Sequence, residues 1–460
     1  MIPVTSRHSQ SIAVFGLGTS GLATALALSA GGAIVSAWDD NPDRRAEASN
    51  KNIVLTDPTM MDWSTQDALI LSPGVPLMHP APHPAITGAQ AAGKQVIGDV
   101  ELLFENVAKA RLIGITGTNG KSTTSSLIHH VLRSANVPVQ IGGNFGPPAL
   151  DLEPIRTDDT LVLELSSYQL DLIETAAFDV AVFLNLAPDH LDRHRDMEGY
   201  ASAKKRIFQN HRKSKQTAVI GVDDIHGVTA AAELSERAAW TTIEVSAERV
   251  LPKGVYVTEG ILTDQDGYRY DISKISTLHG PHNWQNAAAA WAIARTLGIA
   301  PDVIATAFKN FPGLPHRLET VATLDGIRFV NDSKATNSEA ASKALSSYDQ
   351  IYWIAGGVAK DGNLTPSLAD LARVRKAYLI GDSAADLGEE LAKYGVSVSE
   401  SGDLATALNE ARADATTDKL KGSVILFSPA CASFDQYPNF EKRGDHFREL
   451  VMSLTAEERV

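Results

Sequence analysis

Short apolar runs alternate with helix-like stretches along most of the chain, a pattern typical of βα units with parallel strands. Up to about residue 97 the apolar runs are SIAVF, AIVSAW, DALILS and KQVIG. A second series begins with RLIGIT, continues through LVLELS, VAVFLN and TAVIG, and ends in helical stretches at residues 281–297 and 301–311. A third series contains IRFVNDS, IYWIAGG, AYLIGDS and SVILFSPA, with helical stretches near residues 384–394 and 404–413. Each series is long enough for an α/β domain of its own.

The length of the chain also favours several domains, because a single hydrophobic core stops growing at about 250–300 residues. We therefore predict an α/β fold of three domains, at residues 1–99, 100–313 and 314–460. The segment FPGLPHR, with Pro312, Gly313 and Pro315, interrupts helix and strand alike and predicts a hinge before the third domain.

Composition and charge narrow the classes of function. The 55 acidic residues outnumber the 41 basic ones, and without a concentrated basic run this balance disfavours binding to nucleic acid or anionic membranes. The chain has neither a signal-peptide core nor an apolar run of the roughly 18 residues that a membrane span needs. We predict a cytoplasmic protein. The single cysteine, Cys431, excludes an intrachain disulfide and a multi-cysteine metal site, and we interpret it as a buried packing residue.

A first glycine loop follows the first apolar run. Gly16, Gly18 and Gly21 have the G-x-G-x-x-G spacing between a predicted strand and a helix, where glycines permit close approach of a diphosphate to the helix N-terminus. About twenty residues on, the next strand ends in Asp39 and Asp40, where an acidic side chain usually meets a ribose or base. The motif alone is compatible with NAD or FAD, with a sugar-nucleotide diphosphate, or with a tight structural turn.

A second loop, TGTNGKS, follows RLIGIT and opens a helix, which predicts ATP binding. Lys121 and the backbone amides of residues 118–122 would wrap a polyphosphate, and the Ser122 hydroxyl would bind Mg²⁺. The loop is a compact variant, because the longer common motif requires glycine at the position of Ile115. Glu164 and His190 are further candidate ligands, although a strand-end glutamate is more often solvated and DHLD can cap a helix.

The order of the motifs resembles that of the Mur ligases over essentially the whole chain. The motifs are GITGTNGKST, LELSSYQLD, NLAPDHLDRH, LHGPHNWQNAAAA, GLPHR, VNDSKATN and SPACASFDQY. The last, with NFEKRGDHF after it, resembles the member that adds D-glutamate. A nicotinamide-dependent oxidoreductase would use only the first loop and an ATP-gated binding protein only the second, so neither explains both.

The resemblance implies a Rossmann-like N-terminal domain for a UDP-linked substrate, a P-loop-type central ATPase domain and a Rossmann-like C-terminal domain for an amino acid. It implies ADP-forming ligation of D-glutamate to UDP-N-acetylmuramoyl-L-alanine through an acyl phosphate, in peptidoglycan precursor synthesis. Two Mg²⁺ ions and a carbamate on a lysine are implied as well. We expect a monomer with no nucleic-acid partner.

The resemblance also implies residue roles. Catalytic roles fall on Lys121, His190, Lys204 and Lys334. The residues expected at ATP are Gly117, Thr118, Asn119, Gly120, Lys121, Ser122, Thr123, Asn283, Asn286, Arg317 and Asp332. Those expected at the UDP substrate are Thr19, Ser20, Asp39, Asp40, Ser72, Gly74 and Asn144. Those expected at D-glutamate are Thr336, Lys360, Ser433, Phe434 and Phe440. The expected metal ligands are Ser122, Glu164, His190 and Lys204 as a carbamate.

Several of these residues have an ordinary interpretation when the resemblance is set aside. Lys204 and Lys205 could be two surface lysines of a helix, and Asp332 and Lys334 a loop ion pair. Phe434 and Phe440 could be core residues, and Asn283 a hydrogen-bonding residue at a helix start.

Overall fold

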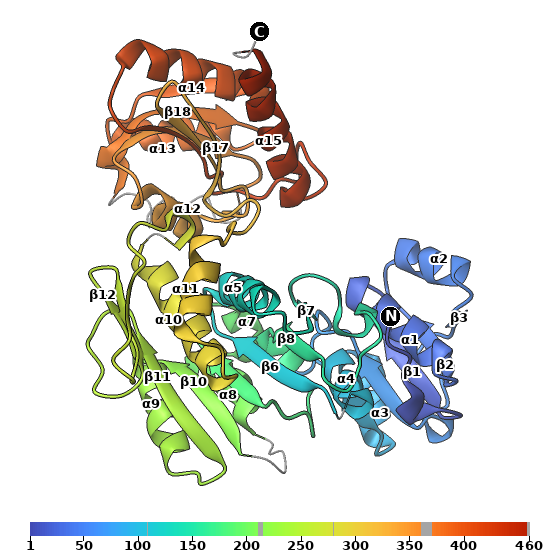
Figure 1. Ribbon diagram of the computed structural model, residues 1–460. Helices are drawn as coiled ribbons and strands as arrows, with labels where there is room; N and C mark the ends of the chain where they lie inside the picture. The colour runs from blue at the N-terminus through green and yellow to red at the C-terminus, as the bar shows by residue number, and fades with distance from the viewer. Residues whose placement is uncertain (108, 210–214, 279, 360–369, 458–460) are drawn as a thin grey trace. The chain divides into compact units, whose positions relative to one another are not determined.

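The computed structural model describes residues 1–107, 109–209, 215–278, 280–359 and 370–457. The chain forms two compact units, Met1–Phe311 and Pro312–Val460. The first contains two sheets and the second contains one (Figure 1). The predicted α/β class is confirmed. The division into three domains stays a prediction, since the first two sheets share one unit. The boundary between the units falls in the segment FPGLPHR, and motion about it also stays a prediction.

The first sheet is entirely parallel, and its order β3-β2-β1-β4-β5 is that of a doubly-wound α/β fold. Its strands are β1 Ser11–Phe15, β2 Ile34–Trp38, β3 Val54–Leu55, β4 Ala68–Leu71 and β5 Gln95–Ile97. Its helices are α1 Thr19–Ala30, α2 Pro42–Asn50, α3 Pro84–Ala91 and α4 Asp99–Asn106. The four predicted strands are confirmed. Strand β3 was missed because it has only two residues, too few to show an apolar pattern.

The second sheet has the order β14-β13-β12-β11-β10-β9-β6-β8-β7; it is parallel from β12 to β7, and β13 pairs antiparallel with both β12 and β14. Strands β6 to β10 are Arg111–Thr116, Val139–Gly143, Thr160–Glu164, Val180–Phe183 and Gln216–Gly221. Strands β11 to β14 are Trp240–Ser246, Val255–Thr258, Ile261–Thr263 and Arg269–Asp271. Helices α5 to α11 are Lys121–Ser134, Ser167–Leu170, Leu191–His194, Met197–Lys205, Ile225–Ser235, Pro281–Thr296 and Pro301–Lys309. The four predicted strands are confirmed; β7 and β11 to β14, which are partly exposed, were missed.

Helices α5, α10 and α11 lie side by side on one face of the second sheet (Figure 1). The four alanines at residues 287–290 are fully buried. Because alanine side chains are small, α10 packs close to both α5 and the strands. This contact fixes the start of α5, which follows the second glycine loop.

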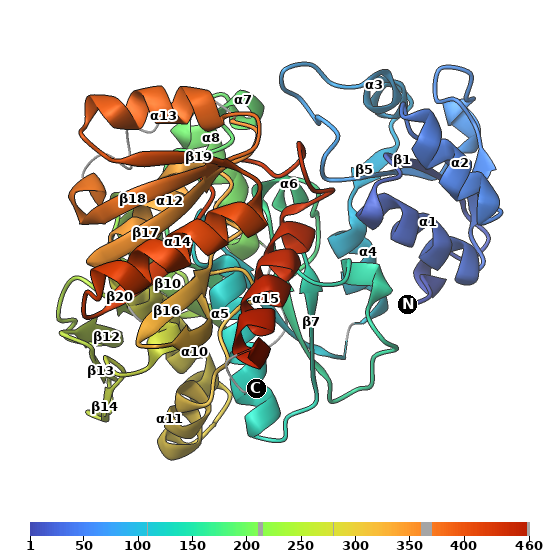
Figure 2. The ribbon, with the colours of Figure 1, turned by 90° about the horizontal axis from the view of Figure 1, so that it is seen from above.

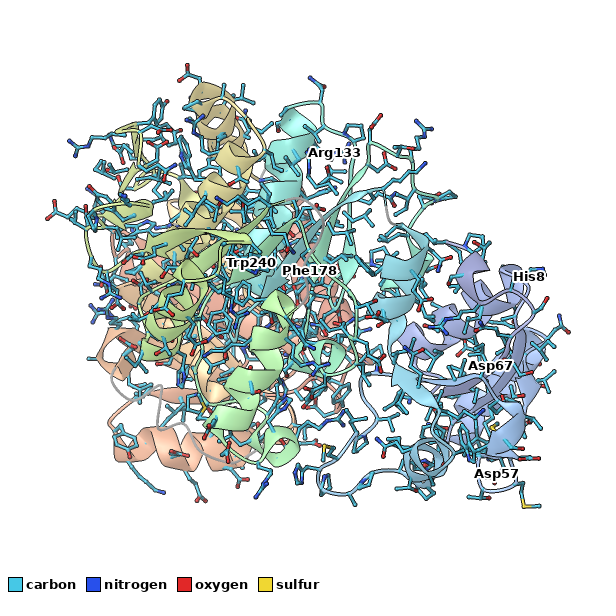
Figure 3. The ribbon with its side chains drawn as sticks, turned by 90° about the horizontal axis from the view of Figure 1, so that it is seen from below. His8, Asp57, Asp67, Arg133, Phe178 and Trp240 are labelled. Carbon is cyan, nitrogen blue, oxygen red and sulfur yellow. The ribbon has the colours of Figure 1, made fainter. Side chains whose placement is uncertain are left out.

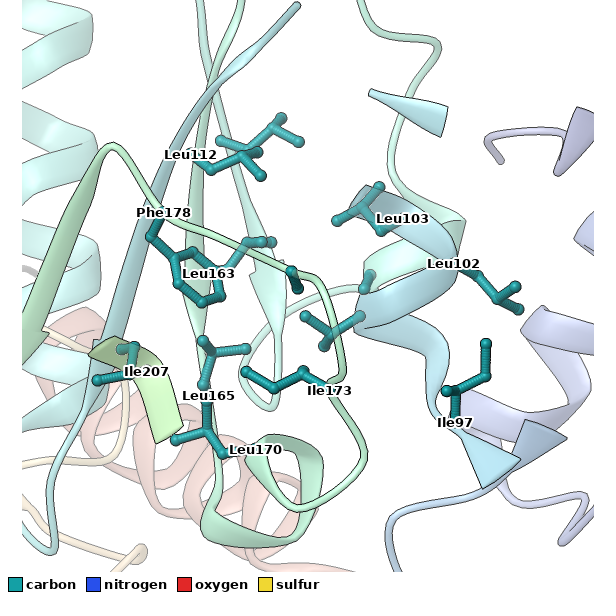
Figure 4. Packing of buried hydrophobic residues seen from close by; sticks show 14 of the residues in the cluster. Ile97, Leu102, Leu103, Leu112, Leu163, Leu165, Leu170, Ile173, Phe178 and Ile207 are labelled. Carbon is teal, nitrogen blue, oxygen red and sulfur yellow. The ribbon is translucent and has the colours of Figure 1, made fainter. Parts of the chain in front are cut away.

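The opposite face of the second sheet shares one hydrophobic core with the first sheet. Leu102 and Leu103 of α4 belong to the same hydrophobic cluster as Leu163 of β8 and Phe178, which lies just before β9 (Figure 4). Phe178 and Trp240, both labelled in Figure 3, are buried in this core. Such a shared core explains why residues 1–311 form a single unit.

The third sheet has the order β15-β16-β20-β17-β18-β19, parallel except for β15. Strands β15 to β20 are Glu319–Leu324, Ile327–Asn331, Gln350–Gly356, Val374–Ile380, Val398–Gly402 and Ser423–Phe427. Helices α12 to α15 are Ser338–Leu345, Ala384–Lys393, Leu404–Asp418 and Phe440–Glu457. Helices α12 and α13 cover one face and α14 and α15 the other (Figure 2). The predicted strands and helices are confirmed, whereas β15 and β19 were missed.

Cys431 is buried, which confirms its interpretation as a packing residue. Among the helices described, none combines the length and the apolar character needed to cross a membrane.

Candidate functional site

The second glycine loop connects the end of β6 to the start of α5. Gly117 and Gly120 have φ angles of 148° and 84°, which favour glycine. A Cβ atom on Gly120 would lie 2.1 Å from Oδ1 of Asn286. The Thr124 hydroxyl donates to Oδ1 of Asn286 at 3.2 Å. Nδ2 of Asn286 in turn donates to Oδ1 of Asn283 at 3.3 Å. Asn286 therefore contacts the loop and helix α5 directly, and Asn283 holds Asn286.

Asn185, which sequence reasoning missed, holds the other side of this loop. Its backbone carbonyl accepts from the Thr118 amide at 2.9 Å, and its side-chain oxygen accepts from the Asn119 amide at 2.9 Å. These two amides therefore donate within the protein, and the contact of the amides of residues 118–122 with a polyphosphate stays a prediction. The available signal was position, because Asn185 opens the motif NLAPDH directly after β9.

Two lysine side chains converge on the loop. Nζ of Lys121 donates to the carbonyls of Gly117 and Thr118 at 3.0 and 2.9 Å. Nζ of Lys204, from α8, donates to the same Gly117 carbonyl at 2.8 Å. Lys204 is only 1% exposed, so its interpretation as a surface lysine is wrong. That interpretation does fit Lys205, which pairs with Glu233 at 3.0 Å near the surface.

Burial sets the protonation state of Lys204. Burial and the neighbouring Lys121 charge lower the pKa of Lys204 to about 6, so its amine is mostly neutral at pH 7. Its Nζ lies 4.7 Å from the centre of the Tyr200 ring. The Tyr200 hydroxyl lies 3.2 Å from Oγ1 of Thr118, and burial raises the pKa of Tyr200 to about 12. Tyr200, another residue missed from the sequence, thus contacts both the loop and the neutral lysine.

Glu164 ends β8 and is 2% exposed, so its interpretation as a solvated glutamate is wrong. Oε1 accepts from Nδ2 of Asn144 at 2.9 Å, whereas Oε2 is buried without a hydrogen-bond partner. An unsatisfied buried carboxylate oxygen is costly, and a hard cation would satisfy it. The structure therefore places Asn144, which we expected at the UDP substrate, against a predicted metal ligand.

His190 lies at the start of α7 with a φ of 53°. Nδ1 lies 2.9 Å from the Tyr168 hydroxyl, and Nε2 lies 3.4 Å from Oδ2 of Asp189. Partial burial lowers the pKa of His190 against the opposing charge of Asp189, and it favours the neutral imidazole, the form that binds metals. In the described part of the chain, no three His, Cys, Asp or Glu side chains form a metal-binding group. A cation here would therefore need ligands such as Ser122 or a modified Lys204.

The first glycine loop is held by the acidic residue that follows β2. Gly16 has a φ of 88°, and a Cβ on Gly21 would lie 1.7 Å from the Gly16 carbonyl oxygen. Asp39 accepts from the amides of Leu17 and Asn41 at 2.6 and 2.8 Å. Although burial opposes ionisation, these hydrogen bonds lower the pKa of Asp39 and keep it charged. Asp39 thus supports the loop.

The remaining residues predicted for the first loop surround the same strand ends. Asp40, Thr19 and Gly74 are exposed. The Ser72 side chain lies beside Gly16, where an added Cβ would come within 2.6 Å of it. The Ser20 hydroxyl donates to Oδ2 of Asp99 at 2.9 Å.

In the second unit, Asp332 lies just beyond the end of β16. Oδ2 accepts from the Ser428 hydroxyl at 2.7 Å and Oδ1 accepts from the Leu318 amide at 3.1 Å. Burial raises the pKa of Asp332 to about 7, with a smaller opposing effect of Arg317. Nζ of Lys334 lies 4.0 Å from the centre of the Phe440 ring.

The residues predicted for the amino acid lie around the ends of β16 and β20. Ser433 is buried and Phe440 is half-buried against Lys334. Phe434 is 73% exposed, so its interpretation as a core residue is wrong. The Thr336 amide donates to the Lys334 carbonyl at 2.8 Å. Lys360 lies outside the described residues.

Comparison with known proteins identifies the family. The Mur ligase middle domain matches residues 115–294, and the Mur ligase, glutamate ligase domain matches residues 316–431. The UDP-N-acetylmuramoylalanine–D-glutamate ligase of Phenylobacterium zucineum is 47% identical over 99% of this chain and 98% of its own length. The chain belongs to the Mur ligase family. Relatives of the same name from Caulobacter vibrioides and Agrobacterium fabrum are 48% and 46% identical over 99% of this chain and 98% and 97% of their own lengths.

Solved structures show the same Mur ligase fold. MurC, the UDP-N-acetylmuramate-alanine ligase of Thermotoga maritima, has a TM-score of 0.58 at 17% identity over 96% of this chain and 99% of its own. MurF of Acinetobacter baumannii has a TM-score of 0.57 at 20% identity over 76% of this chain and 79% of its own. The two glycine loops thus belong to a three-sheet Mur ligase fold.

Proposed function

We propose that this Mur ligase joins D-glutamate to UDP-N-acetylmuramoyl-L-alanine with the conversion of ATP to ADP and phosphate, in peptidoglycan precursor synthesis. The observation that carries the proposal is the identity of 46–48% to ligases of that name, over 97% or more of each relative and 99% of this chain. We further expect the protein to be a monomer and to act in the cytoplasm, where ATP and the soluble precursor are available.

The reaction needs ATP because a carboxylate is a poor electrophile without a good leaving group. A carboxylate oxygen of the muramoyl-alanine substrate attacks the γ-phosphorus, and ADP leaves. The amine of D-glutamate then attacks the acyl carbon, phosphate leaves with the bonding electron pair, and the nitrogen loses a proton. Catalysis of the first step depends on neutralising charge on the transferring phosphoryl group.

The loop of residues 117–123 is the proposed ATP site, with Asn283, Asn286, Arg317 and Asp332. Lys121 already has its ammonium over the loop, where it would meet the terminal phosphates. We propose two bound Mg²⁺ ions, which would supply positive charge near the phosphate oxygens. Ser122, Glu164 and His190 fit as its ligands, since Oε2 of Glu164 is buried without a partner and the His190 imidazole is neutral.

Lys204 completes this set in the proposal as a carbamate. A neutral lysine nitrogen can attack the carbon of CO₂; an N–C bond forms, a proton leaves, and the product carries an anionic carboxylate. The depressed pKa of Lys204 provides the neutral nitrogen that this step needs. The modification would replace a buried amine by the oxygen ligand that Mg²⁺ prefers.

The first glycine loop is the proposed site of the UDP diphosphate, at the N-terminus of α1. The glycines allow close approach, and the helix N-terminus favours negative charge. Thr19, Ser20, Asp40, Ser72 and Gly74 are the proposed contacts. Because Asp39 accepts from the amide of Leu17 in the loop and from the amide of Asn41 at the start of α2, we propose that it acts by holding the loop.

For D-glutamate we propose Thr336, Lys360, Ser433, Phe434 and Phe440, with Lys334 between substrate and phosphate. Lysine and hydroxyl groups suit the carboxylates, whereas the reacting amine must stay neutral and unblocked. The exposure of Phe434 leaves its ring available to a ligand.

Phosphate release tests the proposed function. The purified chain is incubated with ATP, Mg²⁺ and UDP-N-acetylmuramoyl-L-alanine, and single amino acids of both hands are added. We expect release to require D-glutamate and the nucleotide substrate together. A requirement for L-alanine or meso-diaminopimelate instead would refute the substrate assignment, and product formation without ATP would refute the mechanism.

A further inference from the structure

Arg443 is a fully buried arginine of α15 that the proposed mechanism does not use. Arg443 is 1% exposed. Nε donates to the Ser333 hydroxyl at 3.1 Å, and Nη2 donates to the carbonyls of Ser333 and Cys431 at 3.0 Å each. One guanidinium group therefore joins the loop after β16 to the loop after β20.

Both loops carry residues of the proposed amino-acid site. Ser333 lies between Asp332 and Lys334, and Cys431 lies two residues before Ser433. The Ser333 hydroxyl also donates to the carbonyl of Phe440 at 2.9 Å, which extends the connection to the first residue of α15. The hydrogen bonds of Arg443 thus fix the spacing between the proposed contacts.

The loop after β17 meets the same guanidinium. Nη1 of Arg443 is buried without a hydrogen-bond partner, and a Cβ on Gly357 would lie 3.1 Å from it. Glycine at this position therefore leaves space above the arginine. Strands β16, β20 and β17 are neighbours, so Arg443 lies beneath the carboxyl ends of three adjacent parallel strands, where ligands of open α/β sheets bind.

The positive charge of Arg443 is only partly compensated. Burial lowers its pKa to about 10, so the group stays charged at neutral pH. Within the described ranges its hydrogen-bond acceptors are one hydroxyl and two carbonyl oxygens, all uncharged, and the carboxylate of Asp435 acts on the guanidinium only through space. A buried charge with an incomplete set of partners is costly unless something of opposite charge comes near it. D-glutamate brings two carboxylates.

We infer that Arg443 is a positioning residue for the amino-acid site: it joins the loops after β16 and β20 and favours a dicarboxylic substrate through its buried charge. The inference rests on the proposed function, which supplies the identity of the amino acid. Arg443 itself need not contact the substrate, because it acts through Ser333 and Cys431.

The test compares full-length variants in steady-state ligation. For Arg443→Met we expect the KM for D-glutamate to rise by about tenfold or more, the equivalent of one charge-assisted hydrogen bond, while the KM values for ATP and the nucleotide substrate change little. Arg443→Lys keeps the charge but loses the planar fork and should give an intermediate rise. Ser333→Ala keeps the charge and removes the hydroxyl between Arg443 and Phe440, so it isolates the positional part.

Arg448→Met is the matched control. It lies on the same helix and pairs with Glu319 at 2.8 Å, where both side chains are half-buried. We expect it to lower thermal stability without a selective change in the KM for D-glutamate. Arg443→Met variants that lose only kcat, or that raise all three KM values together, would show a purely structural role and overturn the inference.

If Arg443→Met does not fold, as judged by circular dichroism and gel filtration, Arg443→Lys and Ser333→Ala decide. An unchanged KM for D-glutamate in both would overturn the inference. Failure of the wild type to use D-glutamate would instead refute the proposed function. The same variants would then be compared on the amino acid that the wild type accepts, where an unchanged KM would again overturn the positioning role.

Discussion

Replacing Asp332 by asparagine should stabilise the second unit at high pH while it weakens ligation. The carboxyl is buried at the end of β16, and burial raises its pKa from 3.8 to about 7. Asparagine has the same shape and satisfies both neighbours: its oxygen can accept from the Leu318 amide, and its NH₂ can donate to the Ser428 hydroxyl. The variant therefore removes the cost of a buried charge without opening a cavity.

The sign and size of the effect follow from proton linkage. Between pH 4 and 7 the folded state keeps the Asp332 proton that the unfolded state has already lost, so the wild type loses stability as pH rises through this window. Each pH unit is worth about 1.4 kcal/mol, which gives about 4 kcal/mol as the upper limit of the cost above pH 7. The difference in unfolding free energy between Asp332→Asn and wild type should therefore increase up to about pH 7 and then stay constant.

The assay is urea unfolding of the full-length chain at fixed pH values between about 5 and 8. Pulsed hydrogen exchange of peptides from β16 and β20 would report the second unit alone. Asp325→Asn, at the exposed turn between β15 and β16, is the matched control, since its carboxylate remains hydrated in the folded state. A stability difference for Asp332→Asn that is independent of pH, or that favours the wild type at pH 8, would refute the reasoning.

Three further variants test the first unit. Lys121→Ala should abolish ligation because the phosphate loop loses its ammonium; near-normal phosphate release would remove Lys121 from the mechanism. Gly120→Ala should raise the KM for ATP and lower stability by about 1–3 kcal/mol, because its φ is 84° and the new Cβ would displace Asn286; Gly267→Ala has a similar φ and open space, so it reports the backbone cost alone. Lys204→Arg should lose activity, because a guanidinium neither deprotonates nor takes up CO₂, and the carbamate ¹³C signal seen with labelled bicarbonate should disappear; an active Lys204→Arg would exclude the carbamate.

Much of the fold could be predicted from the sequence because parallel strands buried on both faces are continuous apolar runs. RLIGIT, VAVFLN and SVILFSPA all became buried strands in their expected series. Strands β13 and β14 have three residues each, and β14 forms the sheet edge with its first and last residues exposed, so neither carries a long apolar run. The glycine loops were predictable for a local reason, since Gly16 and Gly120 both need positive φ.

The contacts within the site could not be predicted in the same way, because they join residues far apart in sequence. Lys204 and Lys205 are adjacent in the sequence, yet only Lys204 is directed into the interior, toward Gly117. Asn185 and Asn144 hold the phosphate loop and Glu164 through hydrogen bonds that no spacing rule indicates. Arg443 looks like any charged residue of an amphipathic helix until its three hydrogen bonds are seen.

Buried charged side chains that lack a hydrogen-bond partner on one atom identify the proposed sites better than burial alone does. Among the described residues, the charged side chains with an unpartnered buried atom are Glu164, Arg295 and Arg443. Arg295 is accounted for, since its guanidinium pairs with Asp264 and Asp266. Glu164 and Arg443 remain, one at a strand end of the second sheet and one beneath strand ends of the third. A cation at the first and an anion near the second would complete both sets, and Mg²⁺ with a dicarboxylic amino acid provides that pair of charges.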